Sequence, residues 1–186
     1  MTKGTVQHYG LADREDCLVV IIDVQERLMP VISGKERVTA NAVMLAKLCS
    51  ICGIPVIVTE QQKLGPTVGE VKASITDFEP IEKIHFNCFQ NDEFRAKVEG
   101  TGRKTLVLTG VESHICVTQT AIFALPKHQV HVIGDAISSR TPDNKQAALR
   151  RMRDAGAVIS TTEMFVYEVL ARAGTEEFRA ILPLVK

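Results

Sequence analysis

Asp23, Lys83 and Cys116 are the residues whose types and positions point most directly to chemistry. Asp23 ends one apolar run, Lys83 lies in another, and Cys116 follows a third after the turn at 109–113. A carboxylate beside a thiol can accept its proton, and the resulting thiolate is a strong nucleophile. A nearby ammonium group balances the charge of either anion. Together the three residue types indicate covalent chemistry at a cysteine, if the fold brings them to one place.

Cys116 is the most informative of the three because of its expected position in a helix. With Ser113 as the N-cap, Cys116 falls in the first turn, where unpaired amides and the helix dipole favour a thiolate. The same amides can bind an oxyanion. Position alone leaves a second interpretation open, in which Cys116 is a small buried core residue, as free cysteines commonly are. Asp23 could equally be a turn or helix-cap residue.

The histidines predict neither a catalytic pair with Cys116 nor a metal site. His114 lies two residues from Cys116, about 200° around a helix, so the two side chains point in nearly opposite directions. His85 and Cys88 have no second pair of ligands at a matching spacing, and no Asp-x-His motif follows the second predicted strand. The sequence also lacks a glycine-rich loop between a strand and a helix. We therefore predict no metal and no cofactor.

The elements that must position these residues alternate between strands and helices. Short β-branched runs predict strands at 17–23, 55–60, 81–84, 104–110, 129–135 and 157–161. Several are apolar at consecutive positions, which is typical of parallel strands covered by helices on both faces. Helices are expected at 38–52, 92–99, 113–125, 143–155, 162–173 and 176–182. The alternation predicts an α/β fold with a doubly wound parallel sheet of about six strands.

Two segments of this pattern bear on function. Cys49 and Cys52 continue the apolar stripe of helix 38–52 in its last turn, where the dipole disfavours a thiolate, so this pair is predicted to pack in the core. The segment 61–80, with only a short helix expected at 70–74, is long for a connection in a compact domain and is expected to help cover a pocket. In such sheets ligands bind beyond the carboxyl ends of the strands, where Asp23, Lys83 and Cys116 are expected to meet.

Length and charge exclude several classes of function. The 186 residues fit a single domain, 1–186, that can bury a core without disulfides. The 22 Lys and Arg residues balance 22 Asp and Glu residues, so no overall field attracts nucleic acid or an anionic membrane. No apolar run approaches the ~18 residues of a membrane span. Five cysteines, and an opening MTKGTVQHYG without an apolar leader, indicate a cytoplasmic protein.

Three motifs, in the same order and on the same predicted elements, resemble one known family. An apolar run ending in Asp-x-Gln is present as VVIIDVQ, which contains Asp23 and Gln25. A central lysine followed by aromatic and small polar residues is present as KIHFNCF, which contains Lys83 and Phe86. A strand, a glycine, a turn and then Cys-Val are present as LVLTGVESHICVTQTA, around Cys116. The chain thus resembles the isochorismatase-like cysteine hydrolase superfamily, and TEQQKLGPTV resembles its isochorismatase-domain-containing hydrolases of unassigned substrate.

The resemblance implies a three-layer, Rossmann-like fold and a catalytic triad. By this analogy Asp23 takes the thiol proton, Lys83 balances charge and orients the site, and Cys116 attacks the substrate to form a covalent intermediate. The family's non-proline cis peptide bond falls between Val111 and Glu112, and the amides of Glu112 and Cys116 form the oxyanion hole.

The same resemblance implies a substrate but does not identify it. We expect Gln25, Gln61, Phe86 and Val111 to contact a small molecule that is cleaved at an amide or related C–N bond, or at an isochorismate-like vinyl ether. The Asp-x-His metal motif of nicotinamidases is missing. Homo-oligomers are common in the family, and the apolar C-terminal segment 181–185 suits core packing or an interface equally well. The alternative is an inactive protein of this fold that serves as an oligomeric interaction module.

Overall fold

The computed structural model describes residues 10–185, so the expectations for residues 1–9 and for Lys186 lie outside it. All six predicted strands are present, and every neighbouring pair in the sheet is parallel. Their order is β3-β2-β1-β4-β5-β6. The bounds are β1 Cys17–Ile22, β2 Val56–Gln61, β3 Ile81–Lys83, β4 Thr105–Val111, β5 Gln129–Ser138 and β6 Val158–Ser160.

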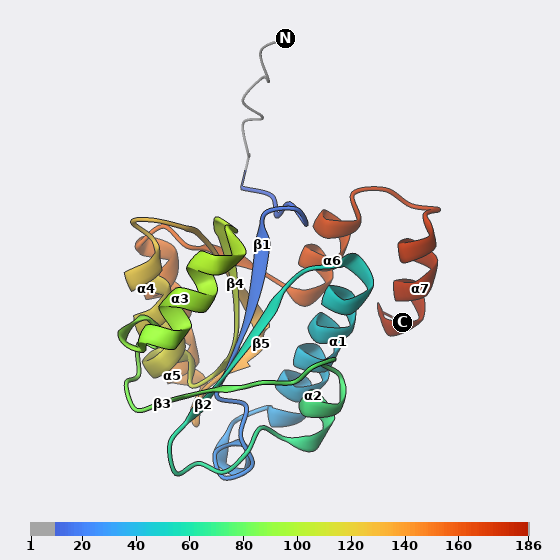
Figure 1. Cartoon of the computed structure of the whole chain (residues 1–186). Coiled ribbons are helices and arrows are strands. Elements are labelled where there is room, and N and C mark those ends of the chain that lie inside the picture. Colours follow the sequence, from blue (N-terminus) through green and yellow to red (C-terminus); the bar gives the residue numbers. More distant parts are fainter. Residues whose placement is uncertain (1–9, 186) are drawn as a thin grey trace.

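Helices cover both faces of this sheet (Figure 1). On one side lie α3 Asp92–Thr101, α4 Thr118–Ala124 and α5 Pro142–Asp154. On the other lie α1 Lys35–Cys52, α2 Gly69–Ala73, α6 Thr162–Leu170 and α7 Glu176–Val185. The predicted three-layer α/β fold is therefore confirmed. Between residues 10 and 185, no helix is long and apolar enough to cross a membrane.

Strand β1 shows why consecutive apolar residues are needed in the centre of the sheet. All of its side chains are buried. Leu18, Val20 and Ile22 enter the core beneath α3, α4 and α5, whereas Val19 and Ile21 enter the core beneath α1, α6 and α7. Because successive side chains of a strand point to opposite faces, each face needs its own apolar set.

The strand order reverses between β1 and β4, and a glycine holds these two strands close together. Gly110 pairs with Ile22 near the end of both strands. Its φ angle is +108°, and a Cβ atom at this position would lie 2.0 Å from the carbonyl oxygen of Ile22. No other residue type fits there without moving one of the strands. The residues that follow β1 and β4 therefore begin at a close, fixed separation.

The segment after β4 differs from the predicted helix 113–125. It begins as a π-helical turn, Ser113–Val117, and becomes α-helical only in α4. Ser113 is not the N-cap: Glu112 occupies that position without a capping side-chain bond, and the Ser113 hydroxyl is buried without a hydrogen-bond partner in the described chain. The Thr118 hydroxyl instead donates to the Ser113 carbonyl at 2.6 Å. The extra residue in this turn changes where its side chains point.

Candidate active site

Asp23 comes directly after β1 and lies in a conformation that is rare for a residue with a side chain. Its φ angle is +53°, in the left-handed region, and the residue is fully buried. The Thr59 hydroxyl donates to Asp23 Oδ1 at 2.8 Å, and the Asp23 amide donates to the Thr59 carbonyl at 3.1 Å. Strand β2 thus fixes both the backbone and the carboxylate of Asp23. Strained backbone of this kind is concentrated at functional sites.

Lys83 ends β3 and reaches across β2 toward Asp23. Its side chain is completely buried, and Nζ donates to Asp23 Oδ2 at 2.7 Å and to Gln61 Oε1 at 2.8 Å. The His85 carbonyl lies 3.3 Å from Nζ, and Cys116 Sγ lies 3.8 Å away. The fold therefore brings together the carboxylate, the ammonium and the thiol that the sequence singled out, from the ends of three different strands.

Burial and pairing set the charges of Asp23 and Lys83. Burial raises the pKa of Asp23 above its usual range, although the Lys83 ammonium and the Thr59 hydroxyl oppose this. Burial acts to lower the pKa of Lys83, but the charge and hydrogen bond of Asp23, together with the sulfurs of Cys88 and Cys116, outweigh it, so that this pKa is raised. We take the pair to be ionic, because a carboxylate and an ammonium at 2.7 Å stabilise each other's charged forms.

Cys116 lies in the π-helical turn after β4 and is nearly buried. Burial, followed by the charge of Asp23, raises the pKa of its thiol well above the usual range, and Lys83 only partly opposes this. The expectation that a helix N-terminus favours a resting thiolate is therefore wrong. Desolvation of the charged form outweighs the amides of one short turn. The site rests as a neutral thiol beside an ion pair.

Cys88 is a second thiol beside Lys83, and its place shortly after Lys83 in the sequence predicted no role for it. It is fully buried, and burial raises the pKa of its thiol to about 11, with Lys83 opposing. The Cys88 amide donates to the Thr120 hydroxyl at 3.0 Å, which ties the turn after β3 to α4. Cys49 and Cys52 are buried on the inner face of α1, as predicted. All five cysteines are free.

The peptide bond between Val111 and Glu112 is cis in the structure, at the bond where the resemblance places it. The Glu112 carboxylate accepts from the Arg140 amide at 3.1 Å and from Arg140 Nε at 3.2 Å. His114 Nδ1 lies 2.9 Å from Ser139 Oγ, so the imidazole of His114 is engaged with the segment after β5. The contact between Arg140 and Glu112 was not predicted, because nothing in the sequence spacing of the two residues indicates it.

Gln25 and Gln61, two of the expected substrate contacts, use their amide groups within the protein. Gln25 is fully buried, and its Nε2 donates to the carbonyls of Gln61 at 3.0 Å and Gly65 at 2.6 Å. The backbone N–H of Gln61 donates to Gln25 Oε1 at 2.8 Å, and the side-chain Nε2 of Gln61 donates to the Ile84 carbonyl at 2.9 Å. These bonds hold the start of the 61–80 segment and, through Gln61, the ammonium of Lys83.

The other two expected contacts differ in exposure. Val111 is fully buried at the end of β4, whereas Phe86 is 52% exposed shortly beyond Lys83. Within residues 10–185, no group of three or more His, Cys, Asp or Glu side chains is arranged to hold a metal ion.

A family model matches most of the chain, including the strands that carry these residues. The model described as the isochorismatase domain matches residues 17–164, from the start of β1 into α6. The chain belongs to the isochorismatase family. The span includes Asp23, Lys83 and Cys116 together with the strands that carry them.

Two curated relatives from eukaryotes illustrate the range of this family. The secreted isochorismatase effector Isc1 of Phytophthora sojae is 34% identical, over 91% of this chain and 84% of that protein. Isochorismatase domain-containing protein 2A of Mus musculus is 30% identical, over 92% of this chain and 84% of that protein.

Two solved bacterial structures share the whole isochorismatase fold. YcaC from Pseudomonas aeruginosa, solved with hexane-2,5-diol and covalent acrylamide, has a TM-score of 0.88 and 28% identity, over 95% of this chain and 92% of that one. YcaC from Escherichia coli, an octameric hydrolase of unknown specificity, has a TM-score of 0.88 and 25% identity, over 95% of this chain and 91% of that one.

Proposed function

We propose that this isochorismatase-family protein is a cysteine hydrolase that cleaves a small molecule at an amide or related C–N bond. The observation that carries the proposal is the position of Lys83 Nζ, 2.7 Å from the carboxylate of Asp23 and 3.8 Å from the sulfur of Cys116. This geometry supports a proton path from thiol to carboxylate, with a fixed positive charge beside the sulfur as it becomes negative. An isochorismate-like vinyl ether is the second bond type.

The reaction on an amide proceeds in two steps. Asp23 takes the proton of Cys116, Sγ attacks the carbonyl carbon, and the proton passes to the departing nitrogen, which leaves as an amine. The amides of Glu112 and Cys116 stabilise the negative oxygen of the tetrahedral intermediate. Water then attacks the thioester, which releases a carboxylic acid and restores the thiol. Phe86 and Val111 contact the substrate.

Several observations support the proposed covalent chemistry, self-association and location of the protein. Covalent acrylamide in the Pseudomonas aeruginosa relative shows that a small amide can become attached to a protein of this fold. The octameric Escherichia coli relative supports self-association of this chain. Five free thiols support a reducing compartment, and we place the protein in the cytoplasm, although one relative is a secreted effector.

A hydrolysis screen tests the proposal. The purified protein is incubated with small amides, ureas and vinyl ethers, and product release is measured against a Cys116→Ala blank. We expect turnover of at least one compound by the wild type and none by the blank. Cys88→Ala is the matched control, because Cys88 is also a buried thiol beside Lys83, and this variant is expected to keep the activity.

Labelling with iodoacetamide gives a second measurement that does not depend on finding the substrate. Cys116 is expected to react first among the five thiols, because Asp23 can take its proton and Lys83 stabilises the sulfur as it becomes negative. Faster reaction at Cys49 or Cys52, with Cys116 inert, would contradict the assignment of the nucleophile.

A further inference from the structure

Glu112 carries a carboxylate beside a backbone amide that is proposed to stabilise negative charge. In the proposed reaction the N–H of Glu112 binds the oxyanion, and within residues 10–185 no group accepts a hydrogen bond from this N–H. The carboxylate of a glutamate lies within about 6 Å of its own amide, because only the bonds of the side chain separate them. A full negative charge at that distance opposes the formation of an oxyanion.

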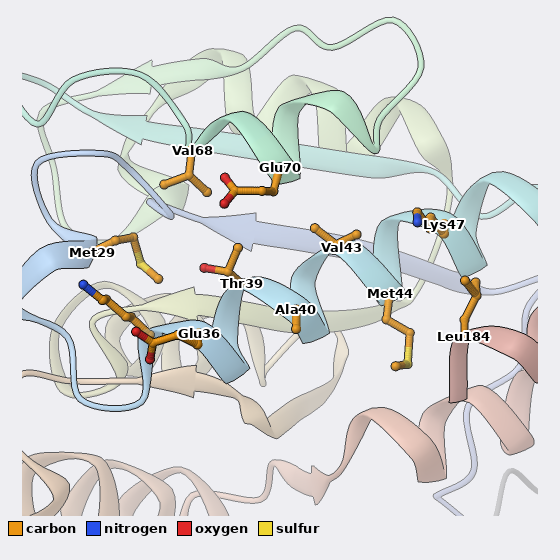
Figure 2. A pocket seen from close by; sticks show the side chains of 11 residues that line it. Met29, Glu36, Thr39, Ala40, Val43, Met44, Lys47, Val68, Glu70 and Leu184 are labelled. Atoms are coloured by element: carbon orange, nitrogen blue, oxygen red, sulfur yellow. The ribbon is translucent and has the colours of Figure 1, made fainter. Parts of the chain in front are cut away.

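Water does little to compensate the charge of Glu112, because its side chain is only 7% exposed. Glu36 and Glu70, which line a cavity of about 740 Å³ beside α1, provide a contrast (Figure 2). Both are exposed, so the high dielectric constant of water weakens their fields. A buried carboxylate keeps more of its field in the surrounding site. A positive group of the protein is therefore needed beside Glu112.

Arg140, which follows β5, provides this positive charge. Its Nε donates to Glu112 Oε2 at 3.2 Å, and its backbone N–H donates to the same oxygen at 3.1 Å. His114 Nδ1 is also near Oε2, at 4.0 Å, but it lies closer to the hydroxyl of Ser139, at 2.9 Å. Within residues 10–185, Arg140 is thus the only cation that forms a hydrogen bond with this carboxylate.

The same contacts hold the carboxylate on one side of β4. Strands β4 and β5 pair as far as Val111 and Ser138, so Glu112 and Arg140 both lie just beyond the paired residues. The bonds from Arg140 therefore draw the carboxylate toward the end of β5. Asp23 follows β1, which pairs with the opposite edge of β4. The negative charge of Glu112 is thus both paired and directed away from the base.

We propose that Arg140 is a positioning residue of the active site, which neutralises the Glu112 carboxylate and holds it at the end of β5 so that the Glu112 amide can stabilise the oxyanion. Arg140 acts through Glu112 and not by contact with the substrate. The inference rests on the proposed function, because it requires that Cys116 attacks a carbonyl group.

Two reagents that react with Cys116 separate this role from a general effect on the thiol. With p-nitrophenyl acetate, the thiol proton passes to Asp23, sulfur attacks the ester carbonyl, an oxyanion forms, and p-nitrophenolate leaves with the electron pair of the broken C–O bond. Water then hydrolyses the acetyl thioester. Iodoacetamide alkylates the same sulfur with loss of iodide, and its carbonyl oxygen gains no charge. Arg140 is therefore expected to matter more for the first reaction.

Arg140→Met is expected to slow the Cys116-dependent release of p-nitrophenolate at least about tenfold, because a charge within about 6 Å of the oxyanion is then unpaired. Alkylation by iodoacetamide, measured by mass spectrometry of the Cys116 peptide, is expected to slow less than about threefold, because no oxyanion forms. Each rate of release is corrected with the same protein carrying Cys116→Ala.

Two further comparisons distinguish the charge of Arg140 from a purely structural contact. In the Glu112→Gln background, Arg140→Met is expected to change the release of p-nitrophenolate less than about twofold, because no carboxylate remains to be neutralised. Arg140→Lys keeps a positive charge and is expected to recover most of the rate lost in Arg140→Met. Circular dichroism checks folding, and these two comparisons remain measurable if Arg140→Met alone does not fold.

Arg151→Met is the matched control, because Arg151 is an exposed arginine in the last turn of α5, at the other end of this helix from Arg140. It is expected to react with both reagents as the wild type does. A wild type without Cys116-dependent release would overturn the proposed hydrolase together with this role. Unchanged release in Arg140→Met, equal slowing with both reagents, or slowing that persists in the Glu112→Gln background would overturn the role of Arg140 alone.

Discussion

Lys83 distributes three N–H donors among four neighbours, and this sets the chemistry of the site. The two shortest contacts, to Asp23 and Gln61, take two of the donors. The third is shared between the carbonyl of His85 at 3.3 Å and the sulfur of Cys116 at 3.8 Å. When the thiol loses its proton, a charge-assisted bond to sulfur becomes the stronger choice. In the proposed reaction, Lys83 can therefore stabilise the sulfur without losing its bond to Asp23.

Gln61 is predicted to act through Lys83 and not by contact with substrate. Gln61→Met removes an acceptor of the ammonium, so we expect kcat to fall about tenfold, the effect of losing one such hydrogen bond, with KM nearly unchanged. Gln61→Glu adds a carboxylate near the pair, which raises the pKa of Asp23 further. Activity is lost as pH falls through that pKa, so the acid limb of the kcat/KM profile moves to higher pH in this variant. A raised KM with an unshifted profile would indicate substrate contact instead.

The meeting of Asp23, Lys83 and Cys116 could be predicted because each one ends or follows an apolar run, and strand ends meet at one edge of a parallel sheet. Their protonation could not be predicted in the same way. The helix dipole acts on Cys116 from its own turn, whereas the pKa of the thiol depends mainly on burial by residues distant in sequence. For the same reason the contacts of Gln61 with Lys83 and of Arg140 with Glu112 could not be predicted, because they join strand ends that are distant in the sequence.

At the scale of elements, the site depends on how closely β1 and β4 approach. Short β-branched runs predicted both strands, and their parallel pairing followed from the fold class. The close approach of Gly110 to Ile22 could not be predicted from the sequence, because a glycine before a turn can be required for many structural reasons. The π-helical turn Ser113–Val117 was also missed, since one additional residue in a turn leaves the apolar pattern of the following helix intact.

Gly110→Ala is expected to lower the free energy of unfolding by about 3 kcal/mol or more, because the new Cβ would overlap the Ile22 carbonyl and the φ angle is unfavourable. Urea denaturation measures this. Gly69→Ala is the control: the position is helical and its Cβ meets nothing within 4 Å, so stability should change little. A Gly110→Ala protein as stable as the wild type would show that the strands can separate at low cost.

At the scale of the whole molecule, the net charge of zero gives no information on the ion pair of Asp23 and Lys83, which is buried in the interior of the domain. Burying two charges costs more than their attraction returns unless the pair is well bonded, so such pairs are commonly retained for function and not for stability. Composition could exclude polyanionic partners, but it could not reveal this pair, because the sum does not depend on position.

Asp23→Asn is predicted to abolish turnover and to lower the free energy of unfolding by ~3–5 kcal/mol, because Lys83 is left buried without a counterion. Asparagine tolerates the left-handed φ of this position and keeps the bond from Thr59. The double variant Asp23→Asn/Lys83→Met is expected to regain wild-type stability or exceed it while staying inactive. Thermal denaturation and the hydrolysis assay together measure both effects.

Lys83→Met alone isolates the remaining carboxyl group. Without the ammonium, the pKa of Asp23, already raised by burial, rises further. A carboxyl whose pKa is higher in the folded state contributes most stability at low pH and loses it as pH rises through that pKa. The variant should therefore be most stable in acid, and a thermal midpoint that instead rises toward neutral pH would contradict this.

The position of β3 links the placement of the Lys83 ammonium to the local stability of the sheet edge. This strand is at the sheet edge and pairs with β2 through only three residues, yet its last side chain crosses two strand spacings, about 9.6 Å, to reach Asp23. If the edge strand frays, the ammonium withdraws from the base and the sulfur together. The free energy of that local opening therefore sets the fraction of molecules that are ready to react, and amide exchange in β3 should report catalytic readiness more closely than global stability does.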